Sequence, residues 1–334
     1  MRLKHIGAMT YARNMEFVRD RGTFFWNLIF PFFLVFGFSF AFSRDGQDLL
    51  TVAVFDGDRL AIERFLTTPG LAQREFATRE LAAERIRNHQ LDLLIDGRDG
   101  SYTVNPSSTS GALVERILAT TPQTAELQRV ELAGRAIRYV DWFVPGVIGM
   151  NVLFSAMFGV GFIIVRYRKN GVLKRLRATP LGAGEFVIAQ MLSRLLILVF
   201  TSIVVFVGTW FFLDLVVVGN VFNLLLVTVL AIMCFISLGL VFAARFRSEE
   251  VANGFINVAL WPMLAFSGVF FSLDSVPPAL QRASLALPLT HYLNASRSIM
   301  LDGAGLAEVL PNVAVLTGMT IAFVAIAALL FRWE

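Results

Sequence analysis

The sequence predicts an α-helical polytopic membrane protein with six transmembrane helices and an extracytoplasmic α/β domain between the first two. Of its 334 residues, 56% are hydrophobic and only 16% are charged, whereas water-soluble domains carry about 25% charged residues. A spanning helix needs about 20 mostly apolar residues. Six runs reach that length, and one long polar segment separates the first run from the second. The six runs are about 24–42, 142–165, 187–213, 221–244, 251–273 and 312–331.

The chain is expected to begin with a cytoplasmic interfacial helix, within residues 1–23. Apolar residues recur along one side of this stretch among charged ones, as in a helix that lies in the membrane surface; they are Leu3, Ile6, Met9 and Phe17. Transmembrane helix 1 follows at 24–42. We do not expect it to be a cleaved signal peptide, because the preceding segment is long and the run itself is crowded with Phe and Trp.

The distribution of cations predicts the orientation in the membrane. The stretch 166–181, RYRKNGVLKRLRATPL, carries six cations and no acid between two apolar runs. Short loops rich in Lys and Arg stay in the cytoplasm, and the next loop, 214–220, has no cation. Both termini are therefore expected to be cytoplasmic. Residues 43–141 are expected outside, since loops longer than about 60 residues cross largely regardless of charge.

Residues 43–141 are expected to fold as a small α/β domain. The segment 79–90 has helical spacing, and three segments are strand-like: 49–55, 91–95 and 101–105. A further helix is expected from about 124 to 139, running directly into the second transmembrane helix. This mixture of patterns predicts a compact α/β domain.

Residues 142–334 are expected to form a five-helix transmembrane domain. Outer interfacial helices are expected at 273–298, because this segment is too polar to span and Pro277-Pro278 favours a helix start. Near the start of the third run, Glu185 and Arg194 fall at the cytoplasmic end, where the arginine can extend toward the interface. Ser248 with two following acids has the pattern of a helix N-cap for the fifth span.

Inside the basic stretch, residues 171–178 have the pattern of a short amphipathic helix. Apolar residues share one face and cations surround it: Val172, Leu173 and Leu176 on the face, Lys174, Arg175 and Arg177 around it. Pro180 prevents the helix from continuing. Charge alone would satisfy the orientation rule, so the apolar face favours a docking element. A plain cytoplasmic loop is the alternative.

The sequence shows no catalytic or metal-binding residues. It lacks the G-x-x-x-x-G-K-[ST] pattern that cradles nucleotide phosphates. Its histidines, His5, His89 and His291, have no metal-ligand spacing and no catalytic partner pattern. The net charge of +4 does not indicate nucleic-acid binding, because the cations cluster beside the apolar runs. Any energy that drives this protein is therefore expected to come from another subunit.

Polar and small residues interrupt the second and fifth spans. Four polar residues at helical spacing are candidates to line a substrate path, with helix–helix hydrogen bonding as the alternative; they are Asn151, Ser155, Asn253 and Asn257. Gly159 and Gly161 are better explained by a close helix contact than by a cofactor site.

Three longer stretches carry a resemblance to a known family. RYVDWFVPGVIGMN (138–151), RYRKNGVLKRLRATPLGAGEF (166–186) and PPALQRASLALPLTHYLNASRSIM (277–300) resemble parts of the ABC-2 type exporter permeases. The second stretch is the most specific, because it is similar to that family's coupling segment, R-x-x-A-T-P-L followed by an acid. The outer domain after the first span resembles the drug-exporter branch, whereas polysaccharide-exporting relatives usually lack it.

The resemblance implies the membrane-spanning permease subunit of an ATP-driven ABC exporter in the bacterial cytoplasmic (inner) membrane. Its substrate would be an amphipathic small molecule or a lipid-like compound. The implied partners are two copies of an ABC ATPase, which would bind ATP and Mg, and a second permease copy, identical or paralogous. Membrane lipids and a periplasmic adaptor complete the set; no cofactor is expected in this chain. The implied ATPase-coupling residues are Val172, Leu173, Lys174, Arg175, Leu176, Arg177 and Glu185.

Two alternatives remain open at this point. Within transport, the substrate could be a glycan or an ion. In a different class, the chain could be a membrane-anchored sensor or assembly factor whose outer domain binds a ligand. A sensor is expected to carry a cytoplasmic signalling domain, whereas only three residues follow Phe331 in this sequence.

Overall fold

The computed structural model describes residues 3–42, 50–55, 65–76, 78–121, 127–134, 137–178, 182–246, 248–273 and 276–330. The chain divides into two compact units. A helical unit comprises Met1–Ser39 and Val140–Glu334, and an α/β unit comprises Phe40–Tyr139.

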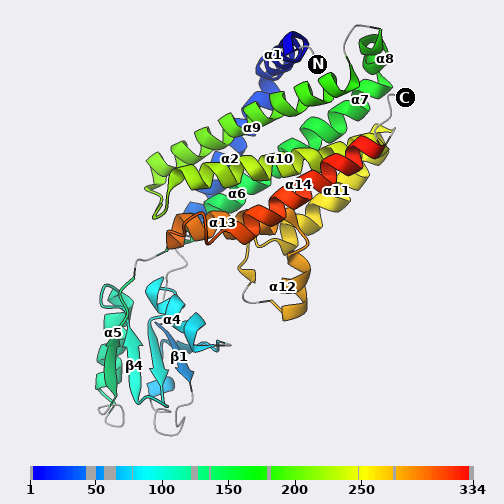
Figure 1. Cartoon of the computed structure of the whole chain (residues 1–334). Coiled ribbons are helices and arrows are strands. Elements are labelled where there is room, and N and C mark those ends of the chain that lie inside the picture. Colours follow the sequence, from blue (N-terminus) through cyan, green and yellow to red (C-terminus); the bar gives the residue numbers. More distant parts are fainter. Residues whose placement is uncertain are drawn as a thin grey trace. The chain divides into compact units, whose positions relative to one another are not determined.

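The helical unit contains an amino-terminal helical pair and a series of helices from the second half of the chain (Figure 1). The pair is α1 (Leu3–Arg19) and α2 (Arg21–Phe42). The later elements are α6 (Tyr139–Ala156), the π-helical stretch η2 (Met157–Phe162), α7 (Ile163–Lys169), α8 (Val172–Arg177), α9 (Ala183–Leu213), α10 (Val221–Arg245), α11 (Glu249–Phe266), α12 (Pro278–Ser284), α13 (Pro288–Asp302) and α14 (Leu310–Leu330).

Within the described part of the chain, five helices are long and apolar enough to cross a membrane: Arg21–Ala41, Tyr139–Lys169, Gly184–Leu213, Val221–Arg245 and Leu310–Leu330. The protein is therefore a polytopic membrane protein. The second and third of these helices are longer than the membrane requires, since at 1.5 Å per residue some 30 residues extend about 45 Å, against a hydrocarbon core of about 30 Å. Their ends therefore reach into the interfacial region or beyond it.

Helix α11 is not among the five, so the six-span count remains a prediction. Glu249 and Glu250 open its 18 residues, and polar residues follow, which lowers its hydropathy. The helix also ends at Phe266, before the end of the expected run. Gly268 takes a left-handed conformation with a φ of 78°, which ends the helical path. The segment expected to be interfacial forms two helices, α12 and α13, and both begin with proline in the first turn.

Helix α10 lies at the centre of the bundle and packs against α9, α13, α14 and η2. Its approach to η2 is close because glycines meet there. A Cβ on Gly161 would lie 3.0 Å from the carbonyl oxygen of Gly239, and one on Gly239 would lie 3.1 Å from that of Ala156. The expected close helix contact at Gly161 is confirmed, and its partner is α10.

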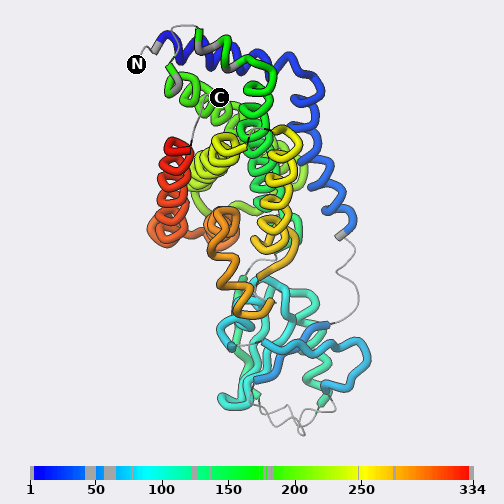
Figure 2. The backbone as a smooth tube through the Cα atoms, turned by 90° about the vertical axis from the view of Figure 1, so that its right-hand side faces the viewer, coloured from blue at the N-terminus to red at the C-terminus, as the bar shows by residue number. Residues whose placement is uncertain are grey.

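The elements of the helical unit sort to two ends (Figures 1 and 2). Helix α1, the α7–α8 turn and the carboxyl end of α14 lie at one end. Helix α12 and the start of α14 lie at the other end. The basic stretch and the two terminal helical elements thus share one side of the unit, which is the arrangement that the cation distribution predicts.

The α/β unit is built on a five-stranded sheet in the order β2-β1-β3-β4-β5. Among the described strands, β3 and β4 pair antiparallel and the other neighbours pair parallel. Alternate residues of β1 and β3 serve two cores. Val52, Leu93 and Ile95 pack with α5, whereas Ala53 and Leu94 pack with α4, as the two-residue period of a strand requires. The elements are β1 (Leu50–Phe55), β2 (Leu71–Gln73), α4 (Arg79–Arg87), β3 (Leu93–Asp96), β4 (Ser101–Val104), α5 (Thr109–Ala119) and β5 (Gln128–Glu131).

The helix expected at 124–139 was wrong over the described residues. Residues 128–131 form the edge strand β5, and α6 begins only at Tyr139. Backbone hydrogen bonds hold this strand beside β4: Gln128 N donates to Gly100 O at 2.8 Å, and Leu132 N donates to Val104 O at 3.0 Å. Pairing with β4 thus overrides the helical spacing of the apolar residues in this segment. Sequence periodicity cannot reveal such a tertiary effect. The remaining residues 124–126 and 135–136 lie outside the described part.

Candidate functional site

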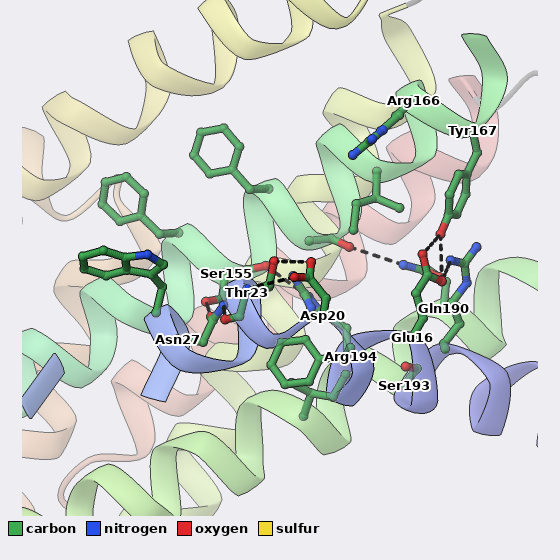
Figure 3. A pocket seen from close by; sticks show the side chains of 18 of the residues that line it. Glu16, Asp20, Thr23, Asn27, Ser155, Arg166, Tyr167, Gln190, Ser193 and Arg194 are labelled. Atoms are coloured by element: carbon green, nitrogen blue, oxygen red, sulfur yellow. Dashed lines mark hydrogen bonds and ion pairs between the residues drawn. The ribbon is translucent and has the colours of Figure 1, made fainter. Parts of the chain in front are cut away.

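A pocket of about 930 Å³ opens between the first helices of the chain and the helices that flank the basic stretch. Its walls come from α1, α2, α6, η2, α7 and α9, with one residue of α8 (Figure 3). Aromatic side chains form one part of the lining: Phe17, Trp26, Phe30, Phe154, Phe158 and Tyr167. Polar and charged side chains form the other part, including Arg13, Glu16, Asp20, Asn27, Asn151, Ser155, Arg166, Gln190 and Arg194.

Asp20 positions the junction between α1 and α2. Its carboxylate accepts hydrogen bonds from Thr23 N at 3.2 Å and from Thr23 Oγ1 at 2.6 Å, as an N-cap does for the free N–H groups of a first helical turn. The hydroxyl bond of Thr23 is the main reason why the pKa of Asp20 lies below its ordinary value. The lip of the pocket therefore has a fixed backbone bend with an ionised acid.

Glu16 and Arg13 form the second charged feature of the lip. Arg13 Nη1 lies 2.6 Å from Glu16 Oε2, and Tyr167 Oη donates to both carboxylate oxygens of Glu16, at 3.1 and 3.2 Å. The Arg13 guanidinium also lies over the Tyr167 ring, 4.0 Å from its centroid. Burial lowers the pKa of Arg13 while the Glu16 carboxylate raises it. These contacts join α1 to α7.

Polar contacts also join α2 to α6 across the pocket. Ser155 Oγ donates to Asn27 Oδ1 in a short hydrogen bond, and Asn151 Nδ2 donates to Asn27 O at 3.4 Å. Asn27 Nδ2 in turn donates to Thr23 O at 2.8 Å. This chain of neutral donors and acceptors runs along the wall of the pocket.

The base of the pocket is formed where α9 meets the π-helical stretch η2. Arg194 Nε donates to Ser155 O at 3.2 Å, and Gln190 Nε2 donates to Gly159 O at 3.3 Å. A Cβ on Gly159 would lie 1.5 Å from Arg194 Nη2, so the guanidinium occupies the space that a larger residue would need. The expected helix contact at Gly159 is thus a side-chain contact. π-Helical turns are frequent at functional sites.

Glu185 lies in the first turn of α9 and holds α1 against it. Its Oε2 accepts from Gly182 N at 3.1 Å and lies 3.5 Å from His5 Nδ1. Further along α9, Ser193 Oγ donates to Asn14 Oδ1 of α1 at 2.6 Å. These contacts assign Glu185 a capping and α1-binding position. Its expected part in ATPase coupling stays a prediction.

The basic stretch folds as two short helices joined by a tight turn. Helix α7 ends at Lys169, Gly171 takes a φ of 68°, and α8 follows. A positive φ favours glycine, because it has no Cβ. Arg168 Nη1 donates to the carbonyls of Ala243 at 3.1 Å and Phe246 at 2.6 Å. A cation is favourable there, at the carboxyl end of α10.

A second set of contacts ties the turn to the start of α11. Ser248 caps α11 as expected, with Val251 N donating to its Oγ at 3.4 Å. Lys169 Nζ lies 3.4 Å from Glu250 Oε1 and 4.0 Å from Glu249 Oε1. The hydrogen bond from Ser248, a backbone hydrogen bond and then the charge of Lys169 lower the pKa of Glu250 to about 2. The cations further along α8, Lys174 and Arg175, remain exposed.

The structure brings together some of the residues predicted for function and separates others. Asn151 and Ser155 lie in the pocket with Asn27. Asn253 and Asn257 lie on α11, where Asn257 Nδ2 donates to Asn253 Oδ1 at 2.9 Å, and they do not line it. Val172 reaches the pocket. The side chains of Leu173, Leu176 and Arg177 lie outside the described part, so the apolar face of α8 stays a prediction.

The pocket also contains Asn27 and Gln190, which the sequence did not single out, and Arg194, which was not predicted to belong to a site. Asn27 interrupts a run of aromatic and aliphatic residues in the first span. Arg194 is a cation within an apolar helix. Ionisable residues inside membrane helices usually mark functional sites. The sequence therefore contained this signal, although the arginine was expected to extend toward the interface.

The spanning helices make this a polytopic membrane protein with a partly polar pocket, and comparison with known proteins identifies it as a transport protein. Residues 97–301 match the family model described as "ABC-2 type transporter". This segment is more than half of the chain, and the chain therefore belongs to the ABC-2 type transporter family. Permeases of this family work with ATPase subunits in ABC transporters.

Several curated relatives are permeases by name. The chain is 26% identical over 194 residues to "Inner membrane transport permease YhhJ" of Escherichia coli, covering 57% of this chain and 52% of that one. It is 26% identical over 187 residues to "Linearmycin resistance permease protein LnrN" of Bacillus subtilis, covering 53% and 46%. It is 23% identical over 167 residues to "Probable multidrug ABC transporter permease YbhR" of E. coli, covering 49% and 45%. The chain thus spans about half of each relative's length.

Proposed function

We propose that this chain is the permease subunit of an ATP-driven exporter, which moves an amphipathic small molecule or lipid-like compound out of a bacterial cell. Family membership supports transport, and the relatives named as multidrug and linearmycin resistance permeases support an amphipathic substrate. The pocket, about 930 Å³ with both aromatic and polar walls, is of a size that suits such a molecule, since ligand pockets are roughly 300–1,000 Å³.

The observation that carries this proposal is the attachment of the α7–α8 turn. Arg168 and Lys169 fasten the turn to α10 and α11, while Val172 at the start of α8 lines the pocket. Lys174 and Arg175 are exposed beyond that attachment. A partner that binds the exposed part would therefore act on a segment that is joined directly to the pocket wall. We assign this role to an ABC ATPase bound in two copies, one to each permease of a dimer.

The test removes the apolar face of α8 and keeps every charge. Leu173→Ser with Leu176→Ser is expected to release the ATPase, since each fully buried side chain contributes about 1.5–3 kcal/mol. Losing both, about 3–6 kcal/mol together, should weaken the complex roughly a hundred- to ten-thousandfold. The measurements are co-purification of the ATPase and substrate-stimulated ATP hydrolysis. The matched control is Leu285→Ser with Leu306→Ser, two exposed leucines outside the basic stretch, which should leave the complex intact.

The outcomes separate the competing functions. Loss of the ATPase in the α8 variant alone supports coupling through this helix. Normal ATPase binding and hydrolysis in that variant would reduce the basic stretch to an orientation signal. If no ATPase co-purifies with the unmodified chain, and an outer-domain ligand binds instead, the sensor alternative would replace the export proposal. An adaptor, if required, would appear as a further co-purifying protein.

A further inference from the structure

Arg194 is a cation that the pocket leaves without an acidic partner. It lies on α9, inside one of the helices long enough to span the membrane, and only 8% of its surface is exposed. Isolated charges in such surroundings are costly, and they are normally paired with an opposite charge. Among the described residues, the nearby charged groups are Arg13, Glu16, Asp20 and Arg166, and none of them forms an ion pair with Arg194.

The two acids of the pocket are already engaged at the lip. Glu16 accepts hydrogen bonds from Arg13 and Tyr167, and Asp20 caps α2 through Thr23. Arg13 is the ion-pair partner of Glu16. No acid of the described lining is thus left over for the buried arginine.

The Arg194 guanidinium is held in a defined place and presents its remaining donors to the pocket. Its Nε donates to Ser155 O, the Phe17 ring lies 5.8 Å from its Cζ, and Gly159 leaves room for it. A guanidinium has five N–H donors, and four of them, on the two Nη atoms, have no hydrogen-bond acceptor in the described residues. Fixed planar donors of this kind match the oxygens of a phosphate or carboxylate.

Further polar atoms lie around this donor set. Gln190 is 4% exposed, and its Oε1 has no hydrogen-bond partner in the part of the chain described. Asn27 and Asn151 lie along the same wall. Aromatic side chains form the neighbouring wall of the pocket: Trp26, Phe30, Phe154 and Phe158. Trp26 is 63% exposed and Phe30 is 39% exposed. An arginine-centred polar base thus adjoins an aromatic wall.

We propose that this pocket binds the anionic headgroup of an amphiphile, with the phosphate or carboxylate on Arg194 and the apolar chain along Trp26, Phe30, Phe154 and Phe158. The inference deepens the proposed export function, because it assigns a charge and a binding site to the substrate class. The same headgroup chemistry could come from an exported compound or from an anionic phospholipid of the bilayer. Both would replace an unpaired buried cation with a charge-assisted pair.

The test uses the full-length chain in phosphatidylcholine nanodiscs and a diazirine-bearing hexadecyl phosphate as the probe. Photolabelling of α2 and α6 peptides measures the affinity. Arg194→Gln is expected to lower the affinity ten- to a hundredfold, and Arg194→Lys less, because the charge remains without the planar donors. Arg166→Gln is the matched control, since this exposed arginine lines the same pocket, and it should change the affinity less than twofold.

The corresponding diazirine-bearing alcohol distinguishes lost binding from a lost fold. It has the same chain and no charge, so its labelling should be weaker than that of the phosphate and unchanged in Arg194→Gln. Gly159→Ala, which keeps the charge but moves the guanidinium, should also weaken phosphate labelling. Equal labelling by the phosphate and the alcohol, or full phosphate affinity in Arg194→Gln, would overturn the proposal.

Phosphatidylglycerol added to the nanodiscs identifies the source of the headgroup. Competition with the probe indicates a bilayer lipid as occupant, and persistence of labelling indicates a single-chain compound; both outcomes support an anion site at Arg194. No ATPase is present in this experiment. Lost headgroup binding together with intact ATPase coupling would therefore refute this inference alone. Intact headgroup binding together with absent ATPase coupling would refute the export proposal alone.

Discussion

A methyl group added at Gly159 should displace the Arg194 guanidinium from the base of the pocket. In Gly159→Ala the new Cβ would lie 1.5 Å from Nη2 and 1.8 Å from both Cζ and Nε, whereas an ordinary contact is 3.4–4 Å. The guanidinium must move by about 2 Å, which breaks its hydrogen bond to Ser155 O. Losing a hydrogen bond to a charged group costs about 1.5–3 kcal/mol, and overpacking adds about 1–3 kcal/mol.

Alanine has the better helix propensity, by up to about 1 kcal/mol, so the net fall in the free energy of unfolding should be about 1.5–5 kcal/mol. The assay is thermal unfolding of the full-length chain in detergent, where the midpoint should drop by several degrees. Gly318→Ala in α14 is the matched control, since nothing lies within 4 Å of a Cβ there. That substitution should leave the midpoint unchanged or raise it.

A double-mutant cycle with Arg194→Ala isolates the clash. Once the guanidinium is gone, Gly159→Ala should cost less than about 1 kcal/mol, because neighbouring sites that share a contact are not additive. The reasoning fails if Gly159→Ala unfolds at the wild-type midpoint. It also fails if the cost is the same with and without the arginine, since the clash would then lie elsewhere.

Two further predictions concern the membrane orientation and the attachment of the α7–α8 turn. Asp99→Cys should react with an impermeant thiol reagent on intact cells, and Asn170→Cys only after lysis; labelling of Asn170→Cys in intact cells would contradict the topology. Lys169→Glu should reduce coupled ATP hydrolysis, and adding Glu250→Lys should restore part of it, since the swap preserves the pair. The pKa of Glu250 is lowered to about 2, so its ion pair with Lys169 persists above pH 4.5 and is lost only as the pH falls toward 2. A defect of Lys169→Glu that changes between pH 6 and 8 would contradict this ion-pair explanation.

The apolar runs of the sequence predicted most of the helical unit. Five of the six correspond to helices that meet the length and hydropathy of a span, because burial in lipid requires continuous apolar stretches that are visible locally. The strands around residues 50–55 and 93–96 were predicted because short apolar runs there are followed by turn residues. The edge strand β5 did not, because its conformation depends on hydrogen bonds to β4, a strand more than twenty residues earlier.

The pocket was only partly predictable from the sequence. Asn151 and Ser155 stood out by helical spacing within one span, but their partner Asn27 belongs to another span, and no pattern links the two. Arg194 was noticed as a charge, although the glycine that makes room for it lies on a different helix. Helical periodicity reports which residues share a face, whereas the identity of the opposing face depends on packing.

The π-helical stretch η2 sets the angular position of α7 relative to α6 within the second span. A π-turn contains one more residue than the α-helical turn that it replaces, and each residue of an α-helix adds about 100° of rotation and 1.5 Å of rise. Helix α7 is therefore rotated relative to α6 by about that angle compared with an uninterrupted helix. Deleting a single residue between Met157 and Phe162 would convert the π-turn to an α-turn and leave Arg168 and Lys169 facing α10 and α11. Straightening the stretch to α-helix without a deletion would instead turn both cations away by about 100°, so the bulge sets the angular position of the basic turn.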